Sequence, residues 1–133
     1  MTAHQPHVQR VLDSFHGGHA IATMLTEANL QHVTEDDLQA AIQTYLNTRD
    51  VYPEREVRLS DGVSRIDLMA GHTGIEVKID GSWANVIRQL TRYAKCTEIE
   101  SLVLVTTRAK HHHLPTQLCN KPLSLVSLVG SAL

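Results

Sequence analysis

The chain has 133 residues and a formal net charge of −2, and 42% of its residues are hydrophobic. This length and apolar content suit one domain with one core. A negative net charge argues against a general polyanion binder, because such proteins usually carry a clear basic excess. No apolar run reaches the roughly 18 residues of a membrane span, and the amino terminus lacks a secretory pattern, so we expect a cytoplasmic protein.

The charge is unevenly distributed along the chain. Residues 1–48 contain a single basic residue, Arg10, whereas residues 49–110 hold ten of the 12 lysines and arginines. The middle of the chain can therefore face a nucleic acid despite the acidic average. Cys96 and Cys119 show no metal-ligand spacing and suggest no disulfide framework.

Helical periodicity dominates the first third of the chain. Apolar residues at helical spacing predict short helices over about residues 8–15 and 21–28, and residues 1–33 are expected to form a helical extension. Thr34 has Asp37 three residues later, which is typical of a helix start. The apolar stripe that follows continues to about Asn47 and predicts the first core helix.

The pattern changes to period two after Pro53 and predicts three strands, over about residues 56–59, 65–68 and 75–79, joined as a meander. Alternate residues of a strand point to opposite faces of the sheet. One face is expected to be apolar, with Val57, Leu59, Ile66, Leu68, Ile75, Val77 and Ile79. The other face then collects Glu56, Arg58, Arg65, Asp67, Glu76 and Lys78.

Ser82 can cap a helix that runs to about Lys95. Residues 102–105 are apolar throughout, which predicts a buried strand, parallel to its neighbour and reached by the helical crossover. We expect a helical turn over residues 115–118 and a final strand over residues 123–129. The histidines at 111–113 indicate a polar loop, because adjacent side chains of an extended segment diverge and make a poor chelate.

One arrangement of charged residues carries chemical meaning. Asp67 is separated by eight residues, which include a glycine-rich turn, from Glu76 in the segment Gly74-Ile75-Glu76-Val77-Lys78. This resembles the signature of the PD-(D/E)xK nuclease superfamily, although Ile66 stands where the signature usually has proline. The crossover helix carries Gln89 and Tyr93 on one face, which is similar to the Gln-x-x-x-Tyr element of the RecB and lambda-exonuclease branch.

The resemblance covers residues 34–106 and implies an α/β, restriction-endonuclease-like fold. Its core would be a helix, a three-stranded meander, a crossover helix and a strand, in a mixed central sheet flanked by helices. Residues 107–133 would add a carboxy-terminal loop and strand. A motif in its expected structural context is stronger evidence than a pattern match alone.

The resemblance also implies a Mg²⁺-dependent deoxyribonuclease with DNA as its partner. Its catalytic residues would be Asp67, Glu76, Lys78 and Gln89. Asp67, Glu76 and the main-chain carbonyl of Val77 would hold Mg²⁺, for which Mn²⁺ should substitute, because hard cations prefer oxygen ligands. Lys78 would orient or deprotonate the attacking water, or stabilise the transition-state charge.

Other residues have weaker claims. Glu56, Glu35 and Tyr93 are auxiliary candidates, although a salt bridge of Glu56 to Arg58 or Arg65 and the helix dipole at Glu35 are simpler explanations. The basic residues Arg88, Arg92 and Lys95 share one side of the crossover helix and suit phosphate contacts, although a solvated face explains them equally well.

Three alternatives to a general deoxyribonuclease stay open. The first is a structure-selective endonuclease of the Holliday-junction-resolvase type. The second is a noncatalytic nucleic-acid-binding or assembly subunit with a nuclease fold, and the third is an α/β domain whose charged strand face is simply solvated. We expect a homodimer or a partner protein to contact the amino-terminal helices.

Overall fold

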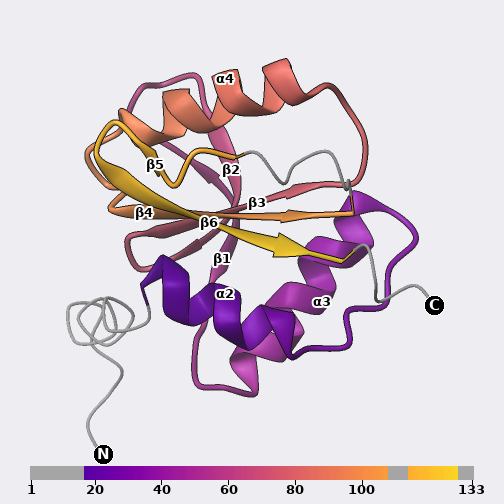
Figure 1. Cartoon of the computed structure of the whole chain (residues 1–133). Coiled ribbons are helices and arrows are strands. Elements are labelled where there is room, and N and C mark those ends of the chain that lie inside the picture. Colours follow the sequence, from indigo (N-terminus) through magenta and orange to yellow (C-terminus); the bar gives the residue numbers. More distant parts are fainter. Residues whose placement is uncertain (1–16, 108–113, 129–133) are drawn as a thin grey trace, which may run out of the picture.

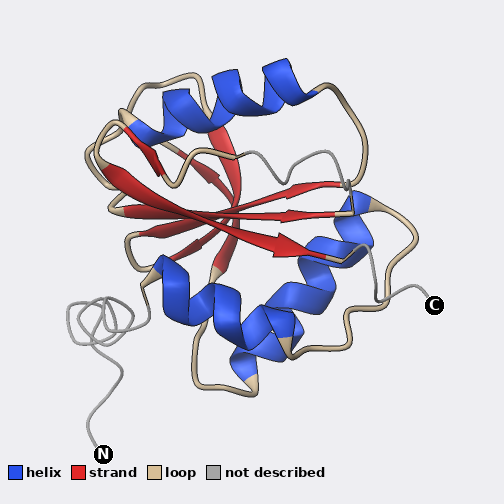
Figure 2. Ribbon diagram, in the orientation of Figure 1, coloured by secondary structure: helices blue, strands red, loops and turns tan. Residues whose placement is uncertain are grey.

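The computed structural model describes residues 17–107 and 114–128. These residues form a six-stranded mixed sheet in the order β1-β2-β3-β4-β6-β5. Helix α4 covers one face of the sheet, and helices α2 and α3 cover the other (Figures 1 and 2). The chain is therefore an α/β protein. The predicted helix at residues 8–15 and the histidines at 111–113 lie outside the described residues.

The elements have the following bounds. The helices are α2 (Gly18–Thr26), α3 (Glu35–Asn47) and α4 (Trp83–Ala94). The strands are β1 (Glu54–Arg58), β2 (Arg65–Ala70), β3 (Thr73–Lys78), β4 (Ser101–Thr106), β5 (Gln117–Leu118) and β6 (Lys121–Ser127). Strand β3 begins two residues earlier than predicted, because the chain already reverses direction at Gly71, which has a φ of 61°.

The predicted starts of the two long helices are confirmed. The Thr34 side chain accepts a hydrogen bond from the Asp37 main-chain N–H, and the Asp37 side chain accepts one from the Thr34 N–H. This capping box satisfies N–H groups that have no partner within the helix. The Ser82 hydroxyl accepts from the Asn85 N–H at the start of α4 in the same manner.

The predicted order of strands and crossover helix is also confirmed. β1, β2 and β3 form an antiparallel meander, and α4 leads to β4, which pairs parallel with β3. Every residue of β4 is buried, as expected for a strand covered by helices on both sides. β6 continues the sheet beside β4, again in parallel.

The prediction that the apolar residues of the meander share one face is wrong. Leu68, Ile75 and Val77 pack with α2 and α3, whereas Leu59 and Ile66 pack with α4. The alternation fails because Glu56, inside β1, has a φ of 55°, which is not a strand conformation. The tip of the β1–β2 hairpin consequently folds onto the face that α4 covers.

Helix α2 is part of the core and not an appendage to it. Ile21 and Leu25 are fully buried among side chains of the sheet and α3. The Gly18 N–H donates to the Ser101 hydroxyl over 3.0 Å, and the hydroxyls of Ser101 and Thr73 lie 2.8 Å apart. The apolar face of α2 is thus used within the chain, and contact of the amino-terminal helices with a partner stays a prediction.

The expected helical turn at residues 115–118 is wrong. Residues 117–118 form strand β5, which pairs antiparallel with β6 through a tight turn at Cys119 and Asn120. Both turn residues have positive φ, 52° and 64°, as a two-residue hairpin turn requires. No helix among residues 17–107 and 114–128 has the length and apolar character needed to cross a membrane.

Candidate functional site

The site lies where strands β2 and β3 stop pairing. Their ladder ends at Leu68 and Ile75, so Asp67 and Glu76 would form the next pair. Their side chains replace the missing ladder bonds: the Val77 N–H donates to Asp67 Oδ2 over 2.8 Å, and the Asp67 N–H donates to Glu76 Oε1 over 3.3 Å. The two carboxylates are therefore held together by the main chain.

Burial disfavours the ionised form of both carboxyl groups. Burial raises the pKa of Glu76 well above its ordinary value, and the neighbouring charge of Asp67 raises it further. Burial also raises the pKa of Asp67, against the opposing effect of the hydrogen bond from the Val77 N–H. Two neighbouring acids whose pKa values burial raises are typical of a functional site or of a cation-binding site.

Lys78 and Tyr93 surround the Glu76 carboxylate. The Lys78 Nζ lies 3.7 Å from Glu76 Oε2, with 23% of the lysine side chain exposed and only 2% of the glutamate. The Tyr93 hydroxyl, which α4 brings to the sheet, lies 3.3 Å from the same oxygen and 3.1 Å from the Arg65 carbonyl. Burial and the charge of Glu76 raise the pKa of Tyr93, so the phenol stays protonated and donates.

Glu35, a weaker candidate from the sequence, reaches the same region. It is the first residue of α3, and its Oε2 accepts a hydrogen bond from the Ile79 N–H over 2.9 Å. Ile79 directly follows Lys78, so α3 is fastened to the end of the strand that carries the site. The charge of Glu35 also contributes, after burial, to the raised pKa of Asp67.

Glu56 is not brought to the carboxylate pair. It would face Asp67 in the register of β1 and β2, but the ladder omits this pair and the Glu56 side chain pairs with Arg65, with 3.4 Å between Oε2 and Nε. The simpler explanation, a salt bridge, is the one the structure contains. The positive φ of Glu56 explains why strand parity misplaced it.

Helix α4 carries the predicted glutamine and the three predicted basic residues. Gln89 is partly buried one turn before Tyr93, on the side of the helix toward the sheet. Arg88, Arg92 and Lys95 are all exposed. Arg88 also donates a hydrogen bond to the Asn85 side chain. Phosphate contacts by the basic residues and a catalytic role of Gln89 stay predictions.

Gly74 shapes the site in a way that the sequence did not reveal. A Cβ at this position would collide with Cδ1 of Ile66 and would lie 3.0 Å from side-chain atoms of Ile99 and Leu102. Ile66 crosses over β3 at this point and packs with α4. The glycine of the Gly-Ile-Glu-Val-Lys segment therefore leaves the space that the Ile66 side chain fills beside β3.

The oxygen donors suit a hard divalent cation. Asp67, Glu76 and the carbonyl of Val77 supply two carboxylates and one neutral oxygen, and Mg²⁺ commonly keeps several water ligands in such sites. Within the described ranges, no group of three or more His, Cys, Asp or Glu side chains is arranged to hold a metal ion. Any metal bound here would thus rely on main-chain oxygen and water beside the two acids.

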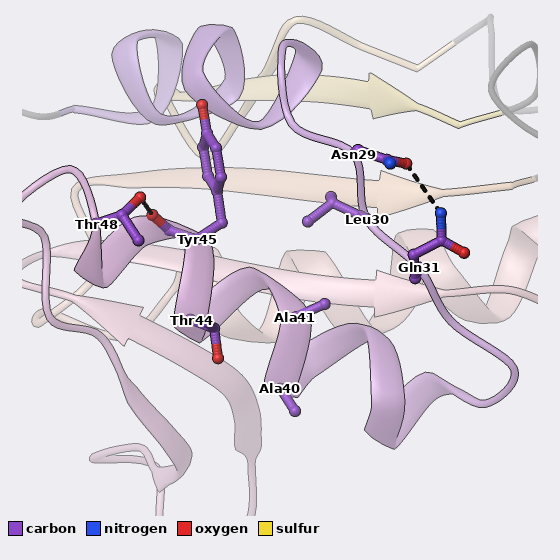
Figure 3. A pocket seen from close by; sticks show the side chains of 8 residues that line it. All are labelled: Asn29, Leu30, Gln31, Ala40, Ala41, Thr44, Tyr45 and Thr48. Carbon is purple, nitrogen blue, oxygen red and sulfur yellow. Dashed lines mark hydrogen bonds between the residues drawn. The ribbon is translucent and has the colours of Figure 1, made fainter.

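A separate hollow of about 440 Å³ lies on α3, away from the acids (Figure 3). The loop at residues 29–31 forms one wall, and Ala40, Ala41, Thr44, Tyr45 and Thr48 form the other. Among the described residues, its lining contains no carboxylate, lysine, arginine or histidine, so it offers no charged side chain to bind a metal ion or a phosphate.

Comparison with known proteins adds no assignment. No family model, no curated protein and no solved structure matches the chain. The functional argument therefore depends on the carboxylates at the end of the β2–β3 ladder and on the side chains around them.

Proposed function

We propose that the chain is a metal-dependent deoxyribonuclease, built on a restriction-endonuclease-like core formed by α3, β1, β2, β3, α4 and β4. One observation carries the proposal: Asp67 and Glu76 meet where β2 and β3 separate, with the Lys78 ammonium 3.7 Å from Glu76. An acid on one strand and an acid-x-lysine segment on the next are thereby combined in one site.

The electrostatics of the pair support a cation. Burying two carboxylates beside each other is unfavourable unless a positive charge compensates them. Lys78 supplies one such charge, yet the pKa of each acid remains raised. A divalent cation held by Asp67, Glu76 and the Val77 carbonyl would remove this penalty, and Mg²⁺ or Mn²⁺ fits the oxygen donors.

Each side chain then has a distinct task in phosphodiester hydrolysis. A bound divalent ion would supply Lewis acidity toward the phosphate and lower the pKa of the attacking water. Lys78, whose side chain is 23% exposed against 2% for Glu76, is placed to orient that water or to stabilise charge on the phosphate oxygens. Tyr93 holds the Glu76 carboxylate in place, and Glu35 holds the end of β3 next to Lys78.

The test is cleavage of linear, circular and single-stranded DNA by the purified protein with Mg²⁺ or Mn²⁺. We expect cleavage that EDTA stops and that Asp67→Asn and Lys78→Ala remove. Asp50→Asn is the matched control, since Asp50 is exposed, lies between α3 and β1, and has a φ of 61°, which asparagine also tolerates.

Two results would overturn the proposal: no cleavage of any DNA form, or cleavage that persists at the same rate in the Lys78→Ala protein. A branched substrate cleaved in preference to linear DNA would instead identify the structure-selective endonuclease. Binding of DNA without metal dependence and without turnover would identify a noncatalytic subunit.

A further inference from the structure

Two arginines face each other across the β1–β2 hairpin. Arg58 and Arg65 are register partners, and both are exposed. Like charges directly opposite each other on a sheet repel and lower stability. Glu56 pairs with Arg65 over 3.4 Å, but among the described residues no carboxylate forms an ion pair with Arg58. The Arg58 guanidinium thus stands on the hairpin without an ion pair among the described residues.

The arginine pair lies beside the acidic site. Arg65 precedes Asp67 by two residues, which is about 7 Å along an extended strand. The Tyr93 hydroxyl lies within hydrogen-bond distance of both the Arg65 carbonyl and Glu76. The main chain of the hairpin is therefore held next to the carboxylates.

The tip of the hairpin is also fixed. Glu98, in the loop between α4 and β4, accepts hydrogen bonds from the Ser60 N–H over 2.7 Å and from the Ser60 hydroxyl over 2.6 Å. Asp61 accepts from the N–H groups of Val63 and Ser64 and from the Ser64 hydroxyl. Hydrogen bonds thereby fix both tip acids, and Arg58 and Arg65 stay exposed to solvent.

Arg92 of α4 adds to the same charge. The pKa of Asp61 is lowered first by its hydrogen bond from the Ser64 hydroxyl and, to a smaller extent, by the charge of Arg92. Arg92 is exposed, and its effect on the pKa of Asp61 puts it within electrostatic reach of the hairpin tip. Arginines of the β1–β2 hairpin and of α4 thus both contribute positive charge to this region.

Building on the nuclease function proposed above, we propose that the β1–β2 hairpin is a phosphate-binding arm. Arg58 and Arg65, with Arg92 alongside, hold backbone phosphates of the nucleic-acid strand whose next phosphodiester bond lies at Asp67 and Glu76. The guanidinium group suits this task, because its planar set of donors matches phosphate oxygens. Such contacts fix the register of the strand and do not read its sequence.

The experiment measures binding of a short fluorescent single-stranded DNA, the RNA of the same sequence and the DNA duplex, by anisotropy in EDTA at several salt concentrations. We expect Arg58→Gln and Arg65→Gln each to reduce the slope of log affinity against log salt by about 0.7 on a single strand. The ratio of wild-type affinity to variant affinity then grows about fivefold for every tenfold fall in salt concentration.

Two further variants separate charge from structure. Glu56→Gln removes the ion-pair partner of Arg65 and should keep or increase affinity, although it alters the same hairpin. Arg49→Gln is the matched control, because Arg49 is exposed just beyond the carboxy-terminal end of α3, whereas Glu35 lies at the other end of that helix. This substitution should leave the slope of log affinity against log salt unchanged. Thermal unfolding of each variant confirms that it is folded.

The outcomes distinguish this proposal from the nuclease function. If the protein cleaves DNA but the Arg58 and Arg65 variants keep the original slope, the arm is overturned and the nuclease stands. If the slope falls as expected but no substrate is cleaved, the arm stands and the nuclease function is overturned. A wild-type protein that binds none of the three nucleic acids overturns the arm.

Discussion

The Val77 main-chain N–H donates to the Asp67 carboxylate over 2.8 Å, across the gap that opens where β2 and β3 stop pairing. In a regular antiparallel ladder this N–H would bond a main-chain carbonyl. Here the Asp67 side chain takes the place of that carbonyl, so the carboxylate lies between the main chains of β2 and β3. The separation of the strands and the position of the acid therefore depend on each other.

Replacing Glu76 by glutamine should change how stability depends on pH. The pKa of Glu76 is raised in the folded protein above its ordinary 4.5, so the folded state binds this proton more tightly than the unfolded state does. The contribution of Glu76 to the free energy of unfolding is thus greatest below pH 4.5. It falls as the pH rises toward the raised pKa, by at most about 1.4 kcal/mol per pH unit.

Urea unfolding of the metal-free proteins at several pH values tests this. The difference in unfolding free energy between Glu76→Gln and wild type should grow in favour of the variant from pH 4.5 upward. The groups with lowered pKa, Asp37, Asp61 and Glu98, have the opposite pH dependence but cancel in the difference. Parallel pH profiles for the two proteins would contradict the prediction.

Removing the Tyr93 hydroxyl should destabilise the protein by about 1 kcal/mol. In Tyr93→Phe the Arg65 carbonyl and Glu76 Oε2 each lose a nearby donor in a buried setting, and an unsatisfied buried polar group is costly. Tyr52→Phe is the control, because Tyr52 is 52% exposed and its hydroxyl donates to the exposed Asp50 side chain over 3.3 Å. Equal effects of the two substitutions in urea unfolding would show that the Tyr93 contact contributes nothing specific.

Adding a methyl group at Gly74 should destabilise the protein by about 1–3 kcal/mol, because the new Cβ collides with Cδ1 of Ile66. Ile66→Val removes that carbon and alone costs about 0.5–1.5 kcal/mol. The double variant Gly74→Ala/Ile66→Val should therefore be more stable than the sum of the single effects predicts. Additive effects in a double-mutant cycle would mean that Ile66 does not fill the space at Gly74.

Glu35→Gln and Glu35→Ala should have different consequences. The glutamine retains an oxygen that accepts from the Ile79 N–H, whereas alanine leaves that N–H without its partner at a cost of about 1 kcal/mol. Both variants remove the charge that adds to the effect of burial on the pKa of Asp67. We expect Glu35→Gln to keep the stability of wild type and, in calorimetry, to bind Mg²⁺ more weakly. Equal destabilisation by the two substitutions would rule out the Ile79 contact as the structural role.

Local sequence signals predicted most of the elements. The Thr34 and Ser82 caps, the three strands of the meander and the crossover to β4 depend on short-range patterns, and the structure contains all of them. The same patterns missed the turn at residues 119–120, because Cys-Asn is not among the usual two-residue hairpin signals. Sequence patterns thus predict a cap or a turn when the residue types that usually adopt that conformation are present.

The candidate site was predicted less completely. Asp67, Glu76 and Lys78 were found from their spacing, and the structure brings them together. Strand parity did not predict that Ile66 crosses over Gly74, since this depends on a left-handed residue in β1 and on contacts with α4. It also did not choose between Glu35 and Glu56, because only the tertiary fold decides which of them reaches β3.

The left-handed conformation of Glu56 has a consequence at the border of the sheet. β1 and β5 are the two outermost strands. β1 has five residues interrupted by Glu56, and β5 has two. A continuous row of free N–H and C=O groups is what an intruding strand needs in order to pair, and Glu56 interrupts that row along β1. Strand pairing between copies of the protein should accordingly be disfavoured along β1.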